Sequence, residues 1–170
     1  MKKSCITRRS FLVAGATTMV TSILPQLNAS VTLELQKYEK KKIISLKNLK
    51  ENEPVYFAYP FDDKNSFIVK LGEVAAGGVG KKGDIVAFNQ YCTHMGMDLT
   101  GTYKKEHKAM GACPMHLTSF DLTRHGMVIA GHATESLPQV QLQVKHDVIY
   151  ATGISGLMYG YSDNLDKGAQ

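Results

Sequence analysis

Two short pairs of cysteine and histidine constrain this chain more than any other feature of its sequence. Cys92 and His94 form a C-x-H pair, and Cys113 and His116 form a C-x-x-H pair, with residues 95–112 between them. Thiolates and imidazoles are the ligands that proteins use for zinc and for iron–sulfur clusters. We therefore expect a fold that brings two loops together around one shared metal centre.

The mixed composition of each pair helps to separate these two kinds of centre. A structural zinc site of the finger type pairs like ligands, as in C-x₂₋₄-C with H-x₃₋₅-H. Here each half carries one Cys and one His. If the two thiolates converge on one iron, the two imidazoles can bind the other, which is the Rieske arrangement of a [2Fe–2S] cluster. A zinc-binding structural module is the alternative from a different functional class.

The segments around these pairs have the pattern of short β-strands. Apolar and β-branched stretches alternate with Gly, Pro, Asn and Asp, and no long 3.6-residue apolar period follows the N-terminal segment. The expected strands are 55–61, 66–72, 84–89, 119–122, 126–131, 139–145 and 147–153. The sequence predicts an all-β fold, a small antiparallel sandwich with a cluster-binding subdomain of two loops.

Residues 1–29 differ in composition from the rest of the chain. Lys2, Lys3, Arg8 and Arg9 precede an uncharged stretch, and no Asp or Glu occurs among them. The Arg pair followed by Ser-Phe-Leu resembles a twin-arginine signal, so we expect export to the periplasm, with an uncleaved membrane anchor as the alternative. The remainder of the chain is nearly neutral and has no surplus of basic residues for a nucleic-acid-binding face.

The sequence divides into four parts on these grounds. They are a twin-arginine export signal (1–29), an N-terminal approach segment (30–50), the domain with both pairs (51–155) and a polar C-terminal tail (156–170). Cys5 lies in the signal, which leaves only Cys92 and Cys113 in the exported part. Two cysteines that each precede a histidine favour metal coordination over a disulfide framework.

Residues 50–155 resemble Rieske iron–sulfur proteins. The resemblance rests on C-T-H-x-G and C-P-x-H in a β context, and on the segment 131–140, which is similar to the loop that covers the cluster. It implies a Rieske-type sandwich with one [2Fe–2S] cluster per chain. The residues it implies for cluster binding are the four metal ligands Cys92, His94, Cys113 and His116, and Thr118, whose hydroxyl would bond a cluster sulfur.

The sequence departs from the quinol-oxidising members of that family. Those proteins resemble C-T-H-L-G-C and C-P-C-H-G-S, and their additional cysteines form a disulfide between the loops. Met97 and Met115 stand at those positions here, so that disulfide cannot form. Phe120 aligns with a Tyr whose hydroxyl bonds the cluster in high-potential members. Because fewer hydrogen bonds stabilise the reduced cluster less, we expect a lower reduction potential.

Residues 92–139 are closely similar to the small subunit of bacterial arsenite oxidase. This resemblance implies an electron-relay subunit of an oxidoreductase, without catalytic residues of its own. Electrons would pass from a large subunit with a molybdopterin centre and a [3Fe–4S] cluster to a periplasmic cytochrome c or cupredoxin. The alternative within the family is the Rieske subunit of a quinol-oxidising complex. A membrane is expected as a partner only if the signal is retained.

Four further histidines are not assigned to iron. They are His107, His125, His132 and His146. We expect the first in a polar insert, either solvated or at a partner surface, and the second and fourth in turns. His132 lies in the expected cover loop, where many Rieske proteins carry Pro, and it either contacts the surroundings of the cluster or is an ordinary surface residue.

Overall fold

The computed structural model describes residues 38–62 and 65–165, and the predicted export signal lies outside them. Within these described residues the secondary structure is β, with a single 3-10 helix, η2 (Leu46–Asn48), and no α-helix. No helix in this part of the chain is long and apolar enough to cross a membrane. The expected all-β class is confirmed.

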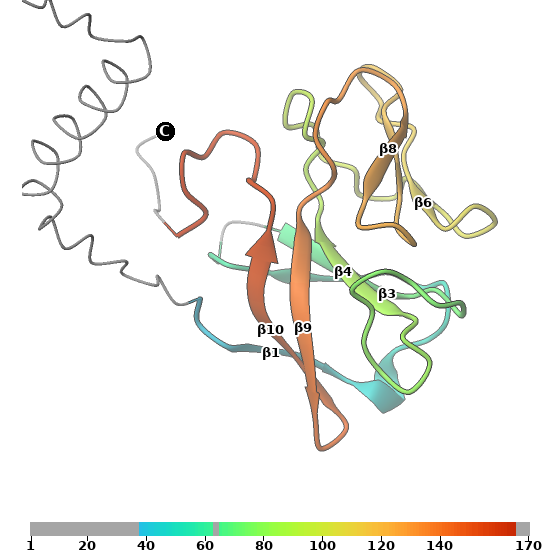
Figure 1. Cartoon of the computed structure of the whole chain (residues 1–170), viewed down its shortest axis with the longest axis vertical. Coiled ribbons are helices and arrows are strands. Elements are labelled where there is room, and N and C mark those ends of the chain that lie inside the picture. Colours follow the sequence, from blue (N-terminus) through green and yellow to red (C-terminus); the bar gives the residue numbers. More distant parts are fainter. Residues whose placement is uncertain (1–37, 63–64, 166–170) are drawn as a thin grey trace, which may run out of the picture. The chain divides into compact units, whose positions relative to one another are not determined.

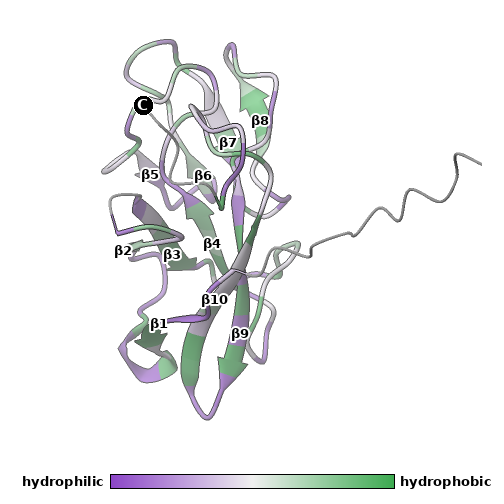
Figure 2. Cartoon of the chain, turned by 90° about the vertical axis from the view of Figure 1, so that its left-hand side faces the viewer, coloured by the Kyte–Doolittle hydropathy of each residue, from purple (hydrophilic) through white to green (hydrophobic). Residues whose placement is uncertain are grey.

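Two antiparallel sheets make up the fold (Figure 1). The six-stranded sheet has the order β1-β10-β9-β4-β3-β2, and the four-stranded sheet has the order β5-β6-β7-β8. The strands are β1 (Lys41–Ser45), β2 (Val55–Ala58), β3 (Asn65–Lys70), β4 (Ile85–Asn89), β5 (Tyr103–Lys104), β6 (Ala109–Met110), β7 (Ser119–Asp121), β8 (Met127–Ala130), β9 (Gln139–Lys145) and β10 (Val148–Ser155). Figure 2 shows the four-stranded sheet at one end and the turn between β9 and β10 at the other.

The hairpin of β3 and β4 is buried on both faces and separates two apolar cores. Phe67 and Phe88 pair across the strands with ring centroids 6.0 Å apart, and both face the core under the four-stranded sheet. Ile68 and Ala87, one position along, face the core enclosed by the six-stranded sheet. Because side chains alternate along a strand, one hairpin can serve as the wall between both cores.

The β9–β10 hairpin confirms the turn expected at His146. Lys145 pairs with Val148, and the two residues between them, His146 and Asp147, have φ values of +47° and +62°. Two positive φ angles in a two-residue loop match the twist of the flanking strands. Asp accepts this conformation more readily than most residues.

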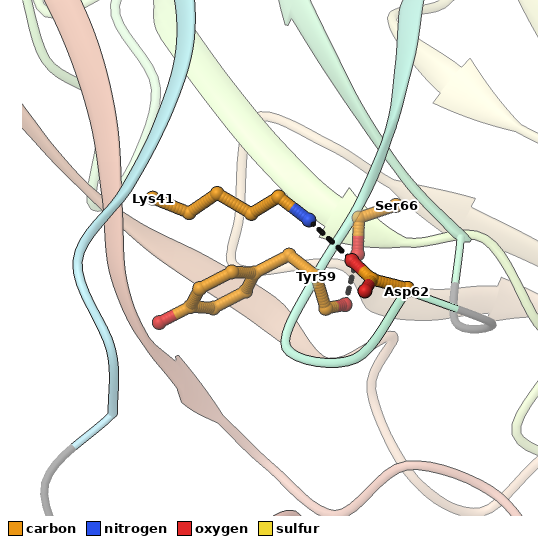
Figure 3. Close-up of polar contacts among 4 residues, drawn as sticks. All are labelled: Lys41, Tyr59, Asp62 and Ser66. Atoms are coloured by element: carbon orange, nitrogen blue, oxygen red, sulfur yellow. Dashed lines mark hydrogen bonds and ion pairs between the residues drawn. The ribbon is translucent and has the colours of Figure 1, made fainter.

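Polar contacts join the segments next to the two edge strands of the six-stranded sheet, and Figure 3 shows that of Lys41 with Asp62. Lys41 on edge strand β1 lies with its Nζ 3.0 Å from Asp62 Oδ1, just beyond edge strand β2. The Tyr59 hydroxyl donates a hydrogen bond to the Glu39 carbonyl at 3.2 Å, and Ser66 Oγ donates to the Tyr59 carbonyl at 3.1 Å. Because the two edges approach one another, the edge strands β1 and β2 are shielded, and their unpaired backbone groups are less open to pairing with another chain.

Part of the expected approach segment belongs to the main sheet. β1 lies within residues 30–50 and pairs with β10, so the sheet begins before residue 51. Its Lys-rich sequence is typical of an edge strand, and the charged residues obscure the apolar alternation. The C-terminal tail is likewise folded as far as residue 165, and Met158 packs into the core of the six-stranded sheet.

Candidate metal centre

The first cysteine–histidine pair lies on a tight loop, residues 91–98, which we call cluster loop 1. The Cys92 N–H donates to the Met97 carbonyl at 2.8 Å, and the Gly96 N–H donates to the Cys92 carbonyl at 2.8 Å. Gly96 has φ +70°, which allows the chain to reverse directly after His94. The loop therefore fixes the cysteine by two backbone bonds and places the histidine at its tip.

The second pair lies on cluster loop 2, residues 112–118, which repeats the same frame. The Cys113 N–H donates to the Thr118 carbonyl at 2.8 Å, and the Leu117 N–H donates to the Cys113 carbonyl at 2.9 Å. The offsets from the cysteine equal those of loop 1, so Leu117 occupies the position of Gly96. Leu117 has φ +60°, a conformation that costs an L-residue about 1 kcal/mol or more.

Replacing Leu117 by glycine is expected to stabilise the protein by about 1 kcal/mol, because the strained φ is relieved. The side chain is 68% exposed, so its removal sacrifices little packing. Urea unfolding of the complete chain measures the change. Met115→Gly, in the same loop without a positive φ, is the control and should destabilise. A Leu117→Gly chain no more stable than that control would contradict the strain argument.

The two cysteines are buried beside one another between the loops. Each side chain is 1% exposed, neither forms a disulfide, and the two thiols lie within hydrogen-bonding reach. Burial raises the pKa of the Cys92 thiol. The backbone N–H groups of His94 and Met95 lower that pKa by donating to its sulfur, and Cys113 raises it further. Such thiols bind iron as thiolates, so binding of the metal displaces their protons.

The two histidines form a second pair, with one member from each loop. The ring centroids of His94 and His116 lie 4.7 Å apart, with the rings nearly perpendicular. His116 Nδ1 is buried and has no hydrogen-bond partner, an arrangement that suits a metal ligand. No group of three or more His, Cys, Asp or Glu side chains in the described residues is placed to hold a single ion. The four side chains form two like pairs, as a two-iron cluster with unlike ends requires.

A third segment, the cover loop (residues 131–135), bonds to both cluster loops. Thr93 Oγ1 donates to the Glu135 carbonyl at 2.7 Å on the side of loop 1. On the side of loop 2, the His132 N–H donates to Thr118 Oγ1 at 3.1 Å. The cover loop thus connects the two loops that lack a disulfide. The Thr118 hydroxyl, which accepts this bond, keeps its own proton to donate toward a cluster sulfur.

His132 is the histidine that the sequence left undecided. Its ring centroid lies 5.7 Å from that of His94 and 6.3 Å from that of His116. It therefore belongs to the surroundings of the candidate ligands, although its residue is exposed. The other three unassigned histidines lie in turns, at 105–108, 122–126 and 146–147, as expected for two of them. Only the tertiary fold brings His132 to the ligands, so spacing could not have assigned it.

Comparison with known protein families identifies the centre. Residues 39–141 match the Rieske [2Fe-2S] domain. The chain belongs to the Rieske family. It is 56% identical to iodate reductase subunit IdrB of Denitromonas iodatirespirans over 96% of this chain and 89% of that protein. It is 51% identical to the subunit of the same name from Pseudomonas sp. (strain SCT) over 97% of this chain and 88% of that protein.

Among solved structures, the soluble domain of Rieske protein II (soxF) from Sulfolobus acidocaldarius has the same fold. The TM-score is 0.63 at 23% identity, over 72% of this chain and 81% of that chain. The expected Rieske-type fold is therefore confirmed. The two antiparallel sheets show that the cluster-binding subdomain contains a four-stranded sheet in addition to its two loops.

The cofactor of this chain is a Rieske [2Fe–2S] cluster, and the zinc-binding module considered above is wrong. The residues present fit this group, because the two loops supply a pair of buried free thiols and a pair of neighbouring imidazoles, one of which has a buried nitrogen without a hydrogen-bond partner. Cys92, Cys113, His94 and His116 would hold the two irons. When bound, the cluster supplies one-electron transfer at a potential raised by its two neutral imidazole ligands.

Proposed function

We propose that this chain is the Rieske electron-transfer subunit of a periplasmic, iodate-reductase-type molybdoenzyme complex. The observation that carries the proposal is the identity of 56% and 51%, over nearly the whole chain, with two iodate reductase subunits. The likeness to the arsenite oxidase small subunit predicted the same kind of role with a different substrate. Iodate replaces arsenite in the proposal because both relatives are subunits of iodate reductases.

The geometry of the metal centre supports a relay without substrate chemistry of its own. The two cysteines are buried, whereas the two histidines are half-buried at the loop tips. Four protein ligands complete the coordination of the two irons, so neither iron offers an open position to a substrate. Electrons can reach the surface through the imidazoles, and the reduction of iodate would take place on another subunit.

The direction of electron flow follows from the substrate. An oxidase delivers electrons from its catalytic subunit, whereas a reductase consumes them. In the proposal, a periplasmic cytochrome c or cupredoxin donates electrons to this cluster, and a large subunit with a molybdopterin centre and a [3Fe–4S] cluster accepts them. The partners expected from the sequence are kept, and the flow between them is reversed. Export by the twin-arginine signal of residues 1–29 is part of the same proposal.

The purified complex tests this proposal by electron paramagnetic resonance. The cluster is reduced, excess reductant is removed, and iodate is added; we expect the signal of the reduced cluster to disappear. Arsenite added to the oxidised complex should not restore it. The Cys113→Ser complex, in which we expect no cluster signal, is the control. Reduction of the cluster by arsenite or by a quinol, with no oxidation by iodate, would overturn the proposal in favour of the arsenite or quinol alternative.

A further inference from the structure

The segment after β10 folds back as a closed loop, residues 156–165, which we call the C-terminal loop (Figure 1). Asn164, 7% exposed, fixes it from within. The Met158 N–H donates to Asn164 Oδ1 at 2.9 Å, and Asn164 Nδ2 donates to the Gly156 carbonyl at 2.7 Å. Met158 is 2% exposed in the core of the six-stranded sheet. Asn164 therefore closes the loop, and Met158 near its start anchors it in the core.

Next to that anchor, Tyr159 lies against cluster loop 1. A Cβ placed on Gly96 would lie 2.5 Å from Tyr159 Cδ1 and 2.8 Å from Cε1, so the ring is in direct contact with the glycine backbone. The Gly96 N–H is the group that donates to the Cys92 carbonyl. A cavity of about 190 Å³ lies beside the contact, lined by Tyr91, Gly96, Met158, Tyr159 and Tyr161.

The comparison of the two cluster loops shows why residue 96 is a glycine. Both loops have the same backbone bonds and both need a positive φ at this position. Loop 2 meets that need with Leu117, whose side chain is 68% exposed. A positive φ therefore does not by itself demand glycine in this frame. The additional constraint at Gly96 is the ring of Tyr159, which is 48% exposed and would have to move to admit a Cβ.

We propose that Tyr159 is a positioning residue for the cluster, and that it clamps loop 1 from the C-terminal loop. By pressing on Gly96, the ring holds the turn that follows His94 and the backbone bond that fixes Cys92. The clamp supports loop 1 where quinol-oxidising Rieske proteins have a disulfide. The inference rests on the ligand set of the metal centre and not on the substrate, so it stands or falls separately from the iodate proposal.

Tyr159→Ala and Tyr159→Phe in the complete complex test the clamp. With Tyr159→Ala we expect several-fold faster loss of the cluster to a chelator, a broadened electron paramagnetic resonance signal and a changed midpoint potential. Tyr159→Phe should behave as the unmodified protein, because the ring and not the hydroxyl contacts Gly96. Leu157→Ala is the matched control, since Leu157 is 54% exposed in the same loop and does not line the cavity at Gly96.

Gly96→Ala approaches the same contact from the other side. The added Cβ displaces the ring, so this variant should also lose the cluster faster. In the double variant Gly96→Ala/Tyr159→Ala the clash is gone and only the strain of Ala at φ +70° remains, so the loss should be smaller than the two single effects together. Direct contact predicts this non-additivity. Additive effects of the two substitutions would overturn the proposal. So would a Tyr159→Ala complex whose cluster lifetime and signal are unchanged, including one that only assembles less well.

Discussion

Replacing Cys113 by serine is expected to abolish the cluster, and this is the largest effect we predict. A serine hydroxyl is a harder and less acidic ligand than a thiol, and it would have to lose its proton in a site that is 1% exposed. Cys92→Ser, His94→Ala and His116→Ala should do the same, because each removes one of four protein ligands. The measurement is iron per chain, together with the visible and electron paramagnetic resonance spectra of the cluster.

Two histidines outside the ligand set serve as controls for that result. His107 is exposed in the turn between β5 and β6, and His132 lies close to the ligand rings. We expect His107→Ala and His132→Ala to keep full iron content. Loss of iron in either variant, with retention in His94→Ala or His116→Ala, would show that the assigned ligand set is wrong.

The two loops that carry the cysteine–histidine pairs and most of the strands could be predicted because their signals are local. The C-x-H and C-x-x-H spacings lie within single loops, and strands such as β9 show their alternation over seven residues. The cluster type followed from the mixed pairs, since each iron needs two like ligands drawn from both loops. Each of these features depends on residues that lie close together in the chain, so its pattern can be read from the sequence alone.

The remainder depends on contacts between distant segments. β5 and β6 contain two residues each, too few to show a period, and they exist through pairing with β7. The hydrogen bond from Thr93 to the Glu135 carbonyl and the contact of Tyr159 with Gly96 join segments more than 40 residues apart. The sequence of this chain indicates least about the substrate, because a relay cluster exchanges electrons with partner proteins and does not bind the substrate.

Gly131→Ala is the second large effect that we expect. A Cβ at this position would lie 2.3 Å from Thr118 Cα and 2.6 Å from Thr118 N, so two backbone segments would have to separate. Gly131 also has φ +98°, which L-residues rarely adopt. Together the clash and the strain should lower the free energy of unfolding by roughly 3 kcal/mol, measured by urea unfolding.

Movement of the cover loop also changes the metal centre. Separation of Gly131 from Thr118 removes the bond from the His132 N–H to the Thr118 hydroxyl, and loop 2 loses a support next to His116. Cluster content should therefore fall along with stability. Gly101→Ala is the matched control, because Gly101 has φ +78° and open space around it, and it should cost about 1 kcal/mol of strain alone. Equal losses in the two variants would show that the cover loop does not press on loop 2.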